Sequence, residues 1–91
     1  MNNQELFEKN LVLTTEFSRH VLEHPEVARR IPKEALVAIL PEYDQELAKK
    51  NLEIVKARRE KDQPIVLVRV KRLAPPRKSR LVKPTLELLP A

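Results

Sequence analysis

The sequence predicts a small α+β (or small α/β) domain with its elements in the order helix, short helix, strand, helix, strand. Apolar residues recur at helical spacing in two long stretches, residues 3–22 and 44–61. Two short apolar stretches, residues 35–40 and 65–70, contain β-branched side chains and are bounded by prolines or polar residues, which is typical of buried strands. The second long helix connects these strands, and strands joined by so long a crossover pair in parallel.

Both ends of the first helix are marked in the sequence. Asn2 can cap the first turn, and Glu5 stands three residues further on, in the spacing of a capping box. Pro25 ends the helix, because the residue before a proline is pushed out of the helical region. The packing stripe has one polar gap, at Asn10, and consists of Leu6, Leu13, Phe17 and Val21, widened by Phe7, Leu11 and Leu22.

The remaining elements follow from prolines, caps and apolar runs. Pro25 can begin a short helical turn over residues 26–30. The strand 35–40 is expected to be buried on both faces, and Pro64 opens the strand 65–70. Asp44 caps the second long helix, whose last turns are basic and so complement the helix dipole. Its packing side consists of Leu47, Ala48, Leu52, Ile54 and Val55.

A sheet of two parallel strands leaves open edges, and so small a sheet is marginally stable by itself. The chain has no disulfide to compensate, because it has no cysteine. We therefore expect the two-stranded parallel sheet to be completed by the C-terminal arm or by a partner chain, which is either a second copy or a different protein. Within the arm, residues 80–83 and 85–89 are the candidate strands.

Charge and proline content divide the chain into a body, residues 1–74, and a basic extended arm, residues 75–91. Residues 1–62 carry 11 basic and 12 acidic side chains, whereas residues 63–91 carry seven basic side chains and one acidic one. The net charge of +5 therefore comes from the last third of the chain. Four of the eight prolines lie in the arm, which can neither continue a helix nor sit inside a sheet.

The composition excludes several classes of protein. The chain has no glycine, which excludes Gly-rich phosphate loops and Rossmann turns. It has no cysteine, which excludes a thiolate metal site or nucleophile and suits the cytosol. It has no apolar run that could cross a membrane, and its first residues carry acids where a secretory signal has bases. We expect a cytoplasmic protein that is not an enzyme and has no cofactor.

Two clusters contain the residue types of metal or acid–base sites. His20 and His24 have the i,i+4 spacing of two metal ligands, but no third strong ligand is evident, and two solvated histidines are the simpler interpretation. Glu42, Asp44 and Glu46 could pair for acid–base chemistry, but acids at the start of a helix also cap it and offset its dipole. No catalytic or metal-binding residue is assigned on these grounds.

The basic arm requires a functional explanation. In one interpretation it docks on an acidic protein surface, where aliphatic side chains fill apolar grooves and bases fix the register. The residues predicted to bind that partner are Arg77, Lys78, Arg80, Leu81 and Leu86. In a second interpretation the arm lies along nucleic-acid phosphates. The residues for that role are Arg69, Lys71, Arg72, Arg77, Lys78, Arg80 and Lys83.

A third interpretation is that the arm wraps its own body or a second copy. The large aliphatic side chains of the arm favour protein binding, and its lack of aromatic residues argues against base stacking. We therefore expect a non-enzymatic interaction or regulatory module that self-associates or binds another protein, has no membrane partner, and engages its partner through strand edges and the arm. Nucleic-acid binding is the alternative.

Three motifs resemble those of a known family. They are Glu23-His-Pro-Glu26 followed by Ile31-Pro32, then Leu40-Pro-Glu-Tyr-Asp44 with Glu46-Leu47 and Asn51, and Gln63-Pro-Ile-Val66 leading to Val68-Arg-Val-Lys71. Over about residues 5–75 the chain resembles a group of short bacterial proteins catalogued as a domain family of unknown function. That resemblance implies a bacterial, cytosolic protein and assigns no activity, cofactor or functional residue. A folded body with a tail that wraps a partner is also similar in layout to antitoxins.

Overall fold

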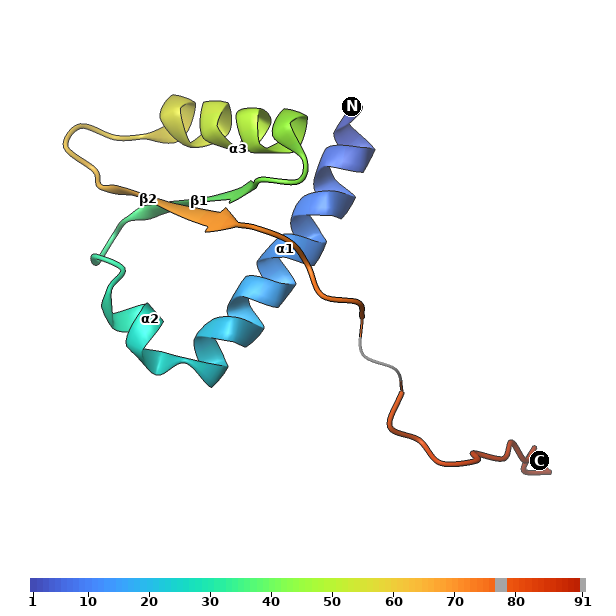
Figure 1. Ribbon diagram of the computed structural model, residues 1–91. Coiled ribbons are helices and arrows are strands. Elements are labelled where there is room, and N and C mark those ends of the chain that lie inside the picture. Colours follow the sequence, from blue (N-terminus) through green and yellow to red (C-terminus); the bar gives the residue numbers. More distant parts are fainter. Residues whose placement is uncertain (77–78, 91) are drawn as a thin grey trace.

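The computed structural model describes residues 1–76 and 79–90 and has the expected elements in the expected order (Figure 1). They are α1 (Asn3–Glu23), α2 (Pro25–Arg29), β1 (Leu36–Pro41), α3 (Gln45–Arg58) and β2 (Ile65–Val70). The strands pair in parallel, in the register Leu36↔Ile65 to Pro41↔Val70. The α+β class and the parallel sheet are therefore confirmed. In the described residues, no helix is both long enough and apolar enough to cross a membrane.

The helix caps are the predicted ones. The backbone N–H of Glu5 donates to Asn2 Oδ1 at 2.8 Å, and that of Leu47 donates to Asp44 Oδ1 at 3.1 Å. The second long helix ends at Arg58, short of the predicted residue 61. It ends early because the chain turns there, with the Glu60 N–H donating to the side-chain oxygen of Gln63 at 3.0 Å.

Two turns precede the strands and require a left-handed backbone in a chain without glycine. Glu34 adopts φ 65° before β1, and Asp62 adopts φ 61° before β2. Gln63 links the two turns, because its amide Nε2 donates to the carbonyl oxygen of Glu34 at 2.8 Å. The same side chain therefore ends α3 and fixes the start of both strands side by side.

The three layers of the fold are α3, the sheet, and the pair α1 and α2 (Figure 1). The core lies between α3 and the sheet, where Ala38 and Leu40 of β1 pack with Val55 of α3. On the opposite face, Val37 and Ile39 are half-buried. The expectation that β1 is buried on both faces is therefore correct for the α3 side and only half correct for the other.

Helix α1 is joined to the other elements by polar contacts that the apolar pattern does not contain. Asn10, the polar gap in the stripe, forms two reciprocal amide hydrogen bonds with Asn51 of α3, at 2.9 and 2.8 Å. The Asn51 amide also donates to the carbonyl oxygen of Ile39 at 2.8 Å, so α1, α3 and β1 meet at one buried side chain.

The packing stripe of α1 is narrower than predicted. Leu13 is buried and Leu6, Phe17 and Val21 are half-buried, as expected. The side chains predicted to widen the stripe, Phe7, Leu11 and Leu22, are exposed, and that expectation is wrong. The reason is that the surface under α1 is a sheet of two strands, which is too narrow to cover a wide apolar stripe.

The arm leaves the body beyond β2, and its described residues add no strand to the sheet (Figure 1). Residues 71–76 and 79–90 contain no helix or strand and are exposed. Leu86, Leu88 and Leu89 are 101 %, 98 % and 94 % exposed, so they bury nothing against the described body. The described arm does not supply the missing strand, and the expectation that a partner chain supplies it stays a prediction.

Candidate interaction site

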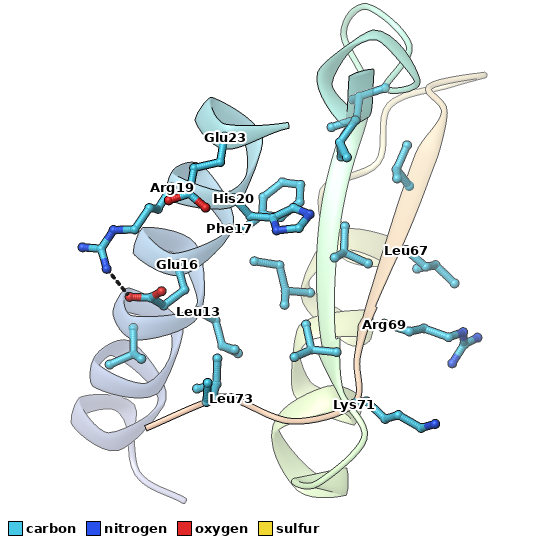
Figure 2. A pocket seen from close by; sticks show the side chains of 18 of the residues that line it. Leu13, Glu16, Phe17, Arg19, His20, Glu23, Leu67, Arg69, Lys71 and Leu73 are labelled. Carbon is cyan, nitrogen blue, oxygen red and sulfur yellow. Dashed lines mark hydrogen bonds and ion pairs between the residues drawn. The ribbon is translucent and has the colours of Figure 1, made fainter. Parts of the chain in front are cut away.

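An open groove of about 1220 Å³ separates α1 and α2 from the sheet (Figure 2). Val66, Val68 and Val70 of β2 and Ile39 of β1 line one wall, because alternate residues of a strand face the same side. Phe17 points toward the strands from α1 on the other wall. The sheet wall of the groove is therefore the apolar face of the sheet that α3 does not cover.

The rim of the groove is polar and has an excess of positive charge. Its acidic residues are Glu16 and Glu23, and its basic residues are Arg19, Arg30, Arg69 and Lys71. Arg19 pairs with Glu16 at 3.0 Å, whereas Arg30, Arg69 and Lys71 form no ion pair within residues 1–76 and 79–90. In Figure 2, Leu67, Arg69 and Lys71 project from the strand on the side away from α1. An acidic group beside this strand would lie close to Arg69 and Lys71, which have no acidic partner in the described residues.

The two edges of the sheet differ. The Leu36 N–H donates to the carbonyl oxygen of Pro64 at 2.9 Å, so the even-numbered backbone groups of β1 face β2 and the odd-numbered ones face outward. On this outer edge of β1, the Asn51 amide donates a hydrogen bond to the carbonyl oxygen of Ile39, and Pro41 has no backbone N–H. The outer edge of β1 is therefore protected in its second half, whereas the outward backbone groups of Val37 and the N–H of Ile39 bond to no described group.

The outer edge of β2 has no such protection in the described part of the chain. By the same alternation, Pro64, Val66, Val68 and Val70 turn their backbone groups toward β1, and Ile65, Leu67 and Arg69 turn theirs outward. No described group bonds to these outward N–H and C=O groups. An open edge of this kind is a template for an added strand. It runs along the apolar groove, so one extended segment could occupy both.

The acidic cluster before α3 has a structural role. Asp44 accepts from the backbone of Leu47 and from Lys9 Nζ at 3.0 Å, and these two contacts hold the pKa of the Asp44 carboxyl below its usual value. The Asp44 hydrogen bond in turn raises the pKa of Lys9. Burial raises the pKa of the neighbouring Tyr43. Glu46 pairs with the amino group of Met1 at 3.0 Å, so the cluster joins α1 to the start of α3.

The two histidines stack on each other at the end of α1. Their ring centroids are 4.4 Å apart, and His24 Nδ1 lies 3.2 Å from Glu26 Oε1. In the described ranges, no three His, Cys, Asp or Glu side chains are arranged to hold a metal ion. Only His20 lines the groove, where it points toward the strands (Figure 2).

The predicted binding residues fall in two separate places. Arg69, Lys71 and Arg72 lie at the end of β2 and just beyond it, and all three are exposed. Arg80, Leu81, Lys83 and Leu86 lie in the arm, exposed and outside the groove, and Arg77 and Lys78 lie outside the described residues. The sequence analysis missed the groove itself, because a pattern of apolar residues does not reveal how far two packed elements stand apart.

One comparison with known proteins gives a match. The model of a family described as a family of unknown function (DUF5647) matches residues 5–84. No curated protein and no solved structure matches the chain. The matched range continues through the first ten residues of the arm, further than the resemblance in the sequence had indicated.

Proposed function

We propose that this chain, which belongs to the family of unknown function DUF5647, is a non-enzymatic protein-interaction module. Its binding surface consists of the β2 edge and the apolar groove beside it, and its partner supplies an extended segment that adds to the sheet. The role is regulatory or architectural, and the setting that suits it is the cytosol. The expected membership of a family of unknown function is confirmed.

One observation carries this proposal. The chain protects the second half of the outer edge of β1 with Asn51 and Pro41 and leaves the whole outer edge of β2 open along an apolar groove. Natural sheets blunt their exposed edges unless an edge is used for pairing, because an open edge invites association. An added strand gains main-chain hydrogen bonds from the edge and specificity from side chains that enter the groove.

The arm contributes the second half of the interaction surface. Leu81 and Leu86 supply apolar anchors, and Arg80 with Arg77 and Lys78 pairs with acidic side chains of the partner. Five large aliphatic side chains of the arm are at least 73 % exposed, which is more apolar surface than a solvated tail carries. These are Leu81, Val82, Leu86, Leu88 and Leu89.

A proline at position 67 tests the role of the edge. The Leu67 N–H faces outward, so Leu67→Pro removes a donor from the open edge without breaking a hydrogen bond to β1. Leu67→Ala removes nearly the same side chain, keeps the N–H, and is the matched control. Pro41 shows that this fold accepts a proline at an outward position of a strand.

Binding is measured in two ways, by light-scattering mass for a second copy and by quantitative capture from cell extract for other proteins. We expect Leu67→Pro to weaken binding about tenfold or more relative to Leu67→Ala, because it removes a main-chain bond and places a ring in the edge. Circular dichroism checks that both variants fold. The proposal fails if wild type, Leu67→Pro and Leu67→Ala have the same mass and capture the same proteins in the same amounts.

Nucleic-acid binding is the second candidate, because the exposed bases at the end of β2 lack acidic partners in the described part of the chain. It predicts that log affinity for an arbitrary duplex falls linearly with log salt concentration. The variant Lys71→Gln would reduce that slope by about one, the change expected for a single phosphate contact. An absence of binding to duplex and single strands at low salt removes this candidate.

A further inference from the structure

We infer that the segment that completes the sheet is residues 85–89 of a second copy of the chain, so that two copies exchange their arms. This inference rests on the proposed function and names the partner of its binding surface. The edge of β2 and the groove are open on the body, and apolar residues of the arm are open in solvent. The body therefore presents a strand edge and an apolar groove with no segment on them, and the arm presents apolar side chains with no surface that covers them.

The alternation of residues 85–89 fits the alternation of β2. On β2, Val66, Val68 and Val70 face the groove, while Arg69 faces the other side. Residues paired across neighbouring strands share a face of the sheet. A strand containing Leu86-Glu87-Leu88 can therefore place its two leucines over the groove and its carboxylate on the face of Arg69.

Charge selects this segment over the other apolar segment of the arm. Glu87 is the one acidic residue in residues 63–91. It would lie on the face of Arg69 and Lys71, which have no acidic partner in residues 1–76 and 79–90. Residues 80–83 would instead place either Arg80 or Lys83 on the face of Arg69, because these two residues lie on opposite faces of a strand. Like charges on neighbouring strands are destabilising.

The geometry of the arm indicates another copy and not its own body. Leu73, Ala74, Pro75 and Pro76 line the end of the groove as the chain leaves β2, and the arm then runs away from the body (Figure 1). A return to β2 would need a reversal at this point. The Pro75-Pro76 pair opposes such a reversal, because it favours extended backbone at the start of the arm. The arm is therefore free to enter the groove of a neighbouring molecule.

Two double variants of the full chain separate the two apolar segments. Leu86→Ser with Leu88→Ser removes the anchors of one segment, and Leu81→Ser with Val82→Ser removes the aliphatic side chains of the other. Phe7→Ser with Leu11→Ser is the control pair, because both side chains are exposed on α1 and neither lines the groove. Sedimentation equilibrium measures the dimer dissociation constant of each. We expect the first pair to raise that constant about tenfold or more and the control pair to change it less than about threefold, because each buried aliphatic contributes through the area it buries.

A charge exchange tests the placement of Glu87 beside Arg69. Glu87→Lys and Arg69→Glu should each weaken the dimer, and the chain carrying both changes should recover most of the loss. The chain has no cysteine, so single-cysteine variants give a direct readout of where the arm lies. After Val68→Cys and Leu88→Cys chains are mixed, a short bismaleimide should join the two different chains more than it joins identical ones.

The inference is overturned if the full chain is a monomer at all accessible concentrations, or if the Leu81 and Val82 pair and not the Leu86 and Leu88 pair controls the dimer. It is also overturned if no link forms between positions 68 and 88 of different chains. A monomer whose capture of another protein still depends on the Leu67 N–H would leave the proposed function standing. A monomer without any such partner would contradict both.

Discussion

The buried contact between Asn10 and Asn51 should be the polar interaction on which the assembly of the fold depends most. Asn51 is 7 % exposed, forms two hydrogen bonds with Asn10 and donates a third to the carbonyl oxygen of Ile39. Asn51→Ala removes all three bonds at once. It also leaves the Ile39 carbonyl without a donor and opens the protected edge of β1.

The magnitude follows from the number of bonds and the burial. A net hydrogen bond contributes about 1 kcal/mol, and a buried group left without a partner costs about 1–3 kcal/mol. We therefore expect Asn51→Ala to lower the free energy of unfolding by about 3 kcal/mol. Asn10→Ala should cost about 1 kcal/mol, because Asn51 keeps its bond to Ile39 and water can reach the half-buried position of Asn10.

Urea denaturation followed by far-UV circular dichroism measures both changes. The double variant should cost little more than Asn51→Ala alone, because the two side chains share their bonds, so the coupling energy should be about 1 kcal/mol. Asn3→Ala, on the exposed first turn of α1, is the control and should stay within about 0.5 kcal/mol of wild type. A loss below about 1 kcal/mol for Asn51→Ala, or strict additivity with Asn10→Ala, would refute this account of how α1 is held.

Three further predictions concern the turns and the cap. Glu34→Gly should raise the free energy of unfolding by about 0.5–1 kcal/mol in urea denaturation. The left-handed φ of 65° strains a non-glycine residue, and relief of this strain should exceed the larger entropy that glycine gives the unfolded chain. A lower stability of the variant would contradict this. Gln63→Ala should lower the free energy of unfolding by about 1 kcal/mol, because it removes the bonds to Glu60 and Glu34. Gln63→Glu should cost less, because its side chain still accepts from the Glu60 N–H and loses only the bond to Glu34. Equal losses would show that the bond from the Glu60 N–H does not stabilise the turn. The lowered pKa of Asp44 means that its stabilising contribution is complete above the ordinary value of 3.8 and is lost as the pH falls through the lower folded value. As the pH falls, Lys9→Met should therefore lose less free energy of unfolding than wild type, although the Leu47 N–H still donates to Asp44 in the variant. The same dependence of stability on pH in both proteins would exclude a stabilising contact between Lys9 and Asp44.

The sequence predicted the elements because local rules determine them. The caps at Asn2 and Asp44 depend on side chains that reach the backbone three residues away, and both were found where the sequence indicated. The parallel pairing followed from the length of the crossover through α3. The end of α3 was placed too late because it depends on Gln63, which acts through a turn and not through helix propensity.

The candidate site was much less predictable than the fold. The valines of β2 were expected in the sheet, and the need for a partner was expected from its small size, but the groove under α1 was not. Asn10 and Asn51 each stand on an otherwise apolar helix stripe, and this coincidence was the signal that could have indicated their contact. The exposed Phe7, Leu11 and Leu22 show the opposite error, since an apolar residue near a stripe need not find a surface to cover it.

By itself, the sequence determined the order and type of the elements, the caps, the parallel sheet and the division of charge between the body and the arm. Only the tertiary structure decided that Asn51 bonds to one edge of the sheet, that the other edge stays open beside a groove, and that the described arm turns away from both. The physical reason is the separation along the chain between the residues that interact. Spacing and capping act over a few residues, whereas the distance between α1 and the sheet and the direction of each backbone N–H are set by contacts between residues that are dozens of positions apart.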